Sequence, residues 1–207
     1  ILADLGVSSH QFDVAERGFS TRFDAELDMR MNQKGDISAY HVVNEYDEQD
    51  IARVLFDYGE LKNARAMANV IVTARKDKEI RNSDELKKVL AKFLPGHKSN
   101  KILAQIYQAI RIEVNQEMDV LKEFLEQSLE ILKPGGRLSV ISYHSLEDRL
   151  VKRFVKNGMF EGEPERDFFG NFEVPFKTIE KLIVPSEEEI AINNRARSAK
   201  LRVAEKI

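Results

Sequence analysis

Two polar stretches, each following an apolar segment, carry the side chains best suited to chemistry. In the first, "DLGVSS", Asp4 interrupts the apolar start of the chain and Gly6 follows two residues later. The second, "SYHS" at 142–145, follows the apolar "RLSVI". A buried carboxylate is costly without partners, so Asp4 either binds a ligand or caps the next loop, and both roles stay open. Gly6 lets the backbone approach a ligand closely.

The elements that position these stretches are strands. Apolar runs at 1–7 and 137–143 predict two strands, and "TIEKLIVP" and "AKLRVAEKI" predict two more. Ligands of open α/β sheets bind at the carboxyl ends of such strands. About 130 residues with mostly helical periodicity separate the first two strands. Since a crossover needs only a dozen or more residues, we expect a helical domain inserted into an α/β domain, with one mixed α+β domain as the alternative.

His144 is a candidate general base, and "HSLED" superficially offers a serine, a histidine and an acid for a hydrolase. However, Ser145 and Asp148 have the spacing of a helix capping box, and no G-x-S-x-G motif is present. Gly158 is expected to end the helix that follows. The remaining histidines show no metal-ligand spacing, so no metal site is predicted.

Composition narrows the classes of protein that remain. The chain has 207 residues, no cysteine and a net charge of −3. The lack of cysteine excludes disulfides and Cys-ligated metal centres and fits the cytoplasm. No apolar run is long enough for a transmembrane helix. Nucleic-acid binding would have to be local, at the basic "RLVKRFVK" or "RARSAKLR", although either run alone is more typical of a solvated surface.

Six blocks carry a resemblance to one bacterial family: "ILADLGVSSHQFD", "AERGFS", "LDMRM", "YQAIRIEVN", "LKPGGRLSVISYHSLEDRLVKRF" and "NNRARSAKLRVAEK". In their order and spacing they resemble the 16S rRNA cytosine-N4-methyltransferases, across essentially the whole chain. The resemblance implies a partial class I, Rossmann-like methyltransferase sheet with an inserted all-helical domain. We expect core residues at 1–27 and 105–207, and a substrate-recognition domain at 28–104.

The resemblance also implies a preceding segment with a glycine-rich cofactor loop and an acid that holds the cofactor ribose. The chain is therefore expected to be a fragment that is inactive alone. The longer protein is called the parent protein below. Its expected activity is transfer of a methyl group from S-adenosylmethionine to the N4 amine of a cytidine in the small ribosomal subunit.

The resemblance assigns roles to individual residues of the site. Asp4 and Gln11 match cofactor contacts, and Asp4 is also the best candidate to accept the N4 protons of the target. Ser142 and His144 are weaker candidates for that task. Tyr143 is the expected stacking partner of the target base, with Phe12 as the weaker alternative.

The expected partner is 16S rRNA. Four basic residues near the carboxyl end are predicted to contact its phosphates: Arg195, Arg197, Lys200 and Arg202. The first strand is expected to leave an apolar edge, which makes a homodimer an alternative to a monomer. A module that binds RNA without catalysis is the alternative function.

Overall fold

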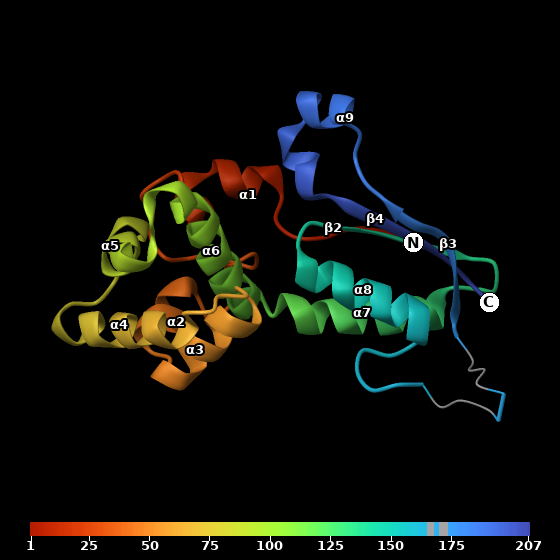
Figure 1. Cartoon of the computed structure of the whole chain (residues 1–207), viewed down its shortest axis with the longest axis horizontal. Helices are drawn as coiled ribbons and strands as arrows, with labels where there is room; N and C mark the ends of the chain where they lie inside the picture. The colour runs from red at the N-terminus through yellow and green to blue at the C-terminus, as the bar shows by residue number, and fades with distance from the viewer. Residues whose placement is uncertain (165–167, 170–173) are drawn as a thin grey trace. The chain divides into compact units, whose positions relative to one another are not determined.

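The computed structural model describes residues 1–164, 168–169 and 174–207, which form two compact units (Figure 1). The sheet unit comprises Ile1–Gly6 and Met118–Ile207, and the helical unit comprises Val7–Glu117. Each unit has its own apolar core. The helical unit extends past both ends of the inserted domain expected at 28–104. The substrate-recognition role of that domain stays a prediction.

The sheet unit is built on a mixed sheet of four strands, which confirms the predicted number. Its strands are β1 (Leu2–Asp4), β2 (Arg137–Ser142), β3 (Phe176–Ile183) and β4 (Lys200–Lys206). Their order is β1-β2-β4-β3, with β1 and β2 parallel and the other pairs antiparallel. β1 is shorter than the predicted 1–7 because Gly6, at φ +81°, turns the chain away from the sheet.

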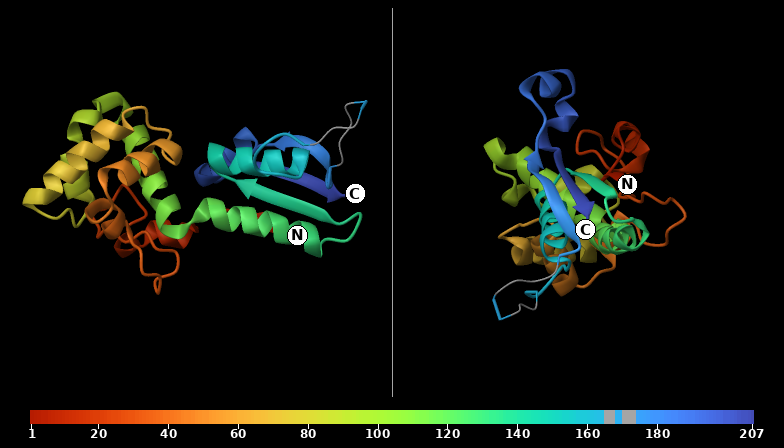
Figure 2. Two further views of the ribbon diagram at one scale, coloured as in Figure 1. Left: turned by 90° about the horizontal axis from the view of Figure 1, so that it is seen from below. Right: turned by 90° about the vertical axis from the view of Figure 1, so that its right-hand side faces the viewer.

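Two helices cover one face of this sheet, α7 (Glu117–Ile131) and α8 (Ser145–Asn157) (Figures 1 and 2). Apolar residues that are one helical turn apart, or that alternate along β2, form the shared core: Leu121, Leu125, Leu138, Val140, Val151 and Phe154. Gly158 ends α8 in the left-handed conformation at φ +72°, as predicted. The carboxyl-terminal part also contains α9 (Glu187–Ile192) and a 3-10 helix at Asn194–Ser198.

The predicted start of α8 is wrong by one residue. His144, not Ser145, is the N-cap, and Glu147, not Asp148, completes the capping box. Ser145 is the first residue of the helix itself. Asp148 instead makes a tertiary ion pair with Arg202, and sequence spacing alone cannot reveal that contact.

The helical unit contains α1 (Ser9–Asp13), α2 (Ala39–Asn44), α3 (Glu48–Asp57), α4 (Ala64–Asp77), α5 (Ser83–Val89) and α6 (Ser99–Asn115). Short 3-10 helices occur at Ala15–Arg17, Ala91–Phe93 and Gly96–Lys98. Asp47 and Asn82 cap α3 and α5 with their side chains. Asn115 at the end of α6 bonds Met29 and Met31, and so ties the irregular segment before α2 to the bundle. None of the described helices has the length and apolar character needed to cross a bilayer.

Candidate active site

Asp4 and Tyr143 meet at one edge of the sheet. Asp4 is the last residue of β1 and Tyr143 follows the last residue of β2. β1 and β2 are parallel, with Asp4 opposite Ile141, so both strands end on the same side. The Tyr143 hydroxyl donates a hydrogen bond to Asp4 Oδ1 at 2.9 Å. Two of the predicted site residues are therefore joined by a direct hydrogen bond.

The surroundings of this hydrogen bond keep Tyr143 protonated, and the bond occupies one oxygen of Asp4. Partial burial, the bond to Asp4 and the negative charge of Asp4 raise the pKa of Tyr143 to about 12. The phenol therefore stays protonated and remains a donor at neutral pH. Oδ1 of Asp4 is engaged, whereas Oδ2 makes no hydrogen bond within the described part of the chain. Asp4 is exposed, so a ligand can reach this second acceptor.

Glu147 is a site residue that the sequence reading missed. The residue is 2% exposed, and its Oε2 accepts hydrogen bonds from the backbone N–H groups of Tyr143 at 2.8 Å and His144 at 3.2 Å. Burial raises the pKa of Glu147, but His144 and the two amide donors outweigh it and hold the pKa below its ordinary value. The H-x-x-E spacing of 144–147 was the available signal, since it too fits a capping box.

His144 is committed to the start of α8. Its Nδ1 accepts the backbone N–H of Glu147 at 3.4 Å, and its Nε2 lies within ion-pair distance of Glu147 Oε1, at 3.3 Å. Both ring nitrogens thus face Glu147. This arrangement gives no support to the hydrolase alternative, in which His144 would activate Ser145.

Ser142 and Gln11 also have local structural roles. Ser142 is buried in β2, and its hydroxyl donates to the Lys200 carbonyl at 3.4 Å. Gln11 lies in the helical unit, where Ser8 and Gln11 form the capping box of α1. The Gln11 carbonyl accepts the Ser8 N–H at 2.8 Å, so its NH₂ group remains as a donor. Phe12, on the same helix, is 36% exposed.

The predicted RNA-binding residues fall into two groups. Arg195 and Arg197 are exposed in the 3-10 helix before β4. Arg202 instead donates from Nε to Asp148 Oδ1 at 2.7 Å, and Lys200 Nζ lies 3.4 Å from Oδ2 of the same carboxylate. The charge of Arg202 is therefore balanced within the fold.

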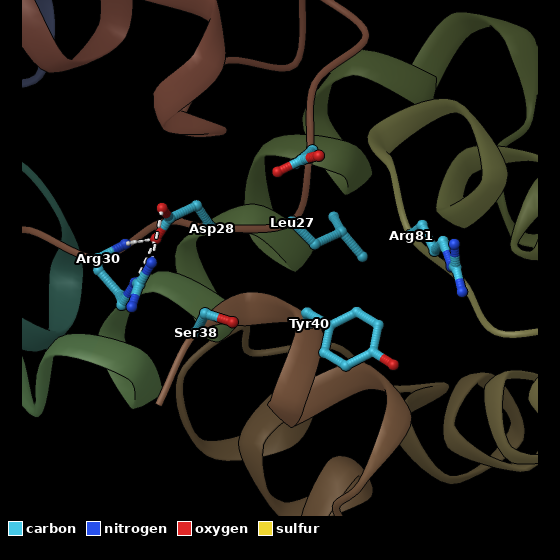
Figure 3. Close-up of a pocket in the computed structure, with 7 residues that line it drawn as sticks. Leu27, Asp28, Arg30, Ser38, Tyr40 and Arg81 are labelled. Atoms are coloured by element: carbon cyan, nitrogen blue, oxygen red, sulfur yellow. Dashed lines mark hydrogen bonds and ion pairs between the residues drawn. The ribbon is translucent and has the colours of Figure 1, made fainter. Parts of the chain in front are cut away.

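A polar hollow of about 250 Å³ opens in the helical unit (Figure 3). It is lined by Glu26, Leu27, Asp28, Arg30, Ser38, Tyr40 and Arg81. Asp28 and Arg30 form a bidentate ion pair, in which Nε donates to Oδ1 at 2.7 Å and Nη2 donates to Oδ2 at 3.1 Å. Burial raises the pKa of Asp28, but this pairing outweighs it and lowers the pKa overall. Ser38 caps α2 together with His41. Because Asp28, Arg30 and Ser38 already have partners, a ligand of these groups would have to displace existing bonds, and the hollow is assigned no role.

The mixed sheet with an exposed acid at a strand end is typical of α/β proteins that bind ligands at that edge. The MraW methylase family matches residues 1–207, and the chain belongs to that family. A relative from Flavobacterium johnsoniae, named ribosomal RNA small subunit methyltransferase H, is 81% identical over all 207 residues, which are 68% of its own length. Relatives with the same name from Flavobacterium psychrophilum and Bacteroides fragilis are 74% and 56% identical and are covered over 71% and 68% of their lengths. These matches confirm the family resemblance and the predicted class of enzyme.

Proposed function

We propose that the parent protein transfers a methyl group from S-adenosylmethionine to the N4 amine of a cytidine in 16S rRNA. Family membership supports the methyltransferase class, and the relatives' name supports the ribosomal substrate. The observation that carries the chemistry is the Asp4 carboxylate, held on one oxygen by Tyr143 and accessible on the other. In this proposal the sheet unit is part of a class I methyltransferase core, and the helical domain recognises the substrate.

The chemistry of the residues present fits a role in cofactor binding. In the sheet unit the exposed Asp4 carboxylate is an acceptor for amino groups, and in the helical unit the NH₂ group of Gln11 is a donor. Gly6, at φ +81°, adopts a conformation that L side chains rarely take, and it leaves the backbone after β1 open to a ligand. When bound, S-adenosylmethionine supplies an electrophilic methyl group on its sulfonium.

The chain's own residues position and deprotonate the attacking amine. The second oxygen of Asp4 would accept an N4–H bond, which keeps lone-pair density on the nitrogen. Asp4 would also take up the proton that N4 must lose on methylation, or pass it to water. Such a site needs no strong base, because orientation and exclusion of water account for much of the acceleration.

A cytidine in folded RNA must leave its stack to reach this carboxylate. The Tyr143 ring, which is only partly buried beside Asp4, is the proposed stacking surface. Exposed Arg195 and Arg197 contact phosphates in this proposal, and the ribosomal substrate puts the protein in the cytoplasm. The second proposed partner is another copy of the chain. The two copies would pair through the edge of β1, where Leu2 is 71% exposed.

The test uses the parent protein and small ribosomal subunits that lack the modification. We expect mass spectrometry of digested rRNA to show N4-methylcytidine with the native protein. Asp4→Ala should reduce the rate by about 100-fold or more, because it removes the acceptor. Asp119→Asn, at an exposed carboxylate of α7, is the control and should leave the rate unchanged. Tight RNA binding without methyl transfer would support the RNA-binding alternative instead.

A further inference from the structure

The carboxylate of Glu147 sits where it can control the geometry of the site without touching a ligand. The residue is 2% exposed and belongs to the first turn of α8. Its Oε2 receives two consecutive backbone N–H groups, those of Tyr143 and His144. These are the two residues that connect β2 to α8, and buried amides of such a connection need acceptors.

The two bonds hold the backbone from which the Tyr143 side chain reaches Asp4. With its amide held at 2.8 Å by Glu147, Tyr143 extends its hydroxyl to Asp4, 139 positions earlier in the sequence. Gly6 borders the same group: a Cβ there would lie 3.9 Å from Glu147 Oε1 and 4.0 Å from the Tyr143 ring. Glu147 thus bonds the exit of β2 from the start of α8, close to the exit of β1.

We propose that Glu147 is a positioning residue for methyl transfer, which acts through the backbone of 143–144 to hold Tyr143 against Asp4. The inference rests on the proposed function for its activity readout only. It concerns the acceptor oxygens of Glu147, since these make the bonds to the two amides. A substitution that keeps an acceptor should therefore preserve the site, and one that removes it should not.

The experiment compares two neutral substitutions of similar size, Glu147→Gln and Glu147→Met. Both remove the charge, but only glutamine keeps an acceptor oxygen. In this chain, amide hydrogen exchange should show Tyr143 and His144 protected in the native form and in Glu147→Gln, and unprotected in Glu147→Met. In the parent protein, Glu147→Met should lower kcat by about 10- to 100-fold with KM for the subunit almost unchanged, and Glu147→Gln should largely rescue it.

Asp119→Asn is the control, because it neutralises an exposed carboxylate of α7 that pairs with Lys122 and not with the site. It should leave both kcat and the amide exchange at 143 and 144 at their native values. If Glu147→Met does not fold, Glu147→Asp takes its place, since the shorter acid cannot reach both amides. Equal kcat and equal exchange for the Gln and Met variants would overturn the proposal. An inactive native parent protein would refute the proposed function, while the exchange data would still decide the role of Glu147.

Discussion

The ion pair between Asp148 and Arg202 leads to a quantitative prediction about the sheet unit. Arg202 Nε lies 2.7 Å from Asp148 Oδ1, and the two side chains are 14% and 13% exposed. Arg202 also donates from Nη1 to the Lys181 carbonyl at 2.8 Å. Arg202 therefore ties α8 to β4 and β3. Asp148 is the carboxylate that balances the charges of Arg202 and Lys200.

The expected cost follows from what each substitution leaves behind. Removing one partner of a buried pair typically costs about 3–5 kcal/mol, because the other charge stays buried. Asp148→Asn leaves Arg202 without its carboxylate, and we expect a loss near the lower end, about 3 kcal/mol. Arg202→Met leaves Asp148 with Lys200, 3.4 Å away, so we expect a smaller loss of about 2 kcal/mol.

Urea unfolding followed by far-UV circular dichroism measures these losses, since the chain has no tryptophan for fluorescence. The double variant should be less destabilised than the sum of the two single ones, with a coupling of about 1–2 kcal/mol. Arg137→Met is the control, because its pair with Glu205 is exposed, at 62% and 32%, and should contribute less than about 1 kcal/mol. If the single substitutions at 148 and 202 cost no more than the control, solvent screens this pair and the reasoning is refuted.

Four further outcomes are expected. Folding lowers the pKa of Glu147 and of Asp148 below their ordinary values of 4.5 and 3.8. The stabilisation that these two groups provide is therefore present above those values and is lost as pH falls through the folded-state pKa values. The urea midpoint should accordingly fall between pH 7 and pH 3. Tyr143→Phe should keep the methyl-transfer rate within about 10-fold, while Tyr143→Ala should lower it by about 100-fold, since stacking contributes about 1–3 kcal/mol per base; equal rates would exclude the stacking role. Gly18→Ala should lower the melting temperature of the helical unit, as φ is +70° and the new Cβ would lie 2.5 Å from the Glu26 carbonyl, whereas the same change at Gly96 meets nothing within 4 Å. Arg197→Gln should reduce the salt dependence of RNA binding by about one unit of slope, and an unchanged slope would remove Arg197 from the interface.

The sequence predicts the strands and helices well where local signals act alone. The apolar run that forms β2 and the stop at Gly158 are such signals, and the structure confirms them. The start of α8 was misassigned because two overlapping capping boxes compete there. In the structure Asp148 bonds Arg202, 54 residues away, instead of serving a cap, and no local pattern encodes that contact.

The candidate site was predictable to the level of the sheet edge. Parallel strands that end together bring Asp4 near Tyr143, and that much follows from the two apolar runs and their polar ends. The hydrogen bond between them depends on the exact path of 143–144, which Glu147 sets from within the helix. The predicted RNA contacts differ in the same way. Arg197 is exposed, as an RNA contact should be, whereas Arg202 forms a buried ion pair with Asp148.

The two acids at the start of α8 connect the stability of the sheet unit to the geometry of its site. Neighbouring helical residues point about 100° apart, so Glu147 faces the loop after β2 while Asp148 faces β4. Asp148 anchors the same helical turn that presents Glu147 to the 143–144 amides. Loss of the anchor should therefore allow that turn to fray first, and release Tyr143 from Asp4 before the sheet itself unfolds. Amide exchange in Arg202→Met should accordingly rise more at 143 and 144 than in the middle of β2. An equal rise in both places would show that the ion pair of Asp148 does not control the contacts of Glu147.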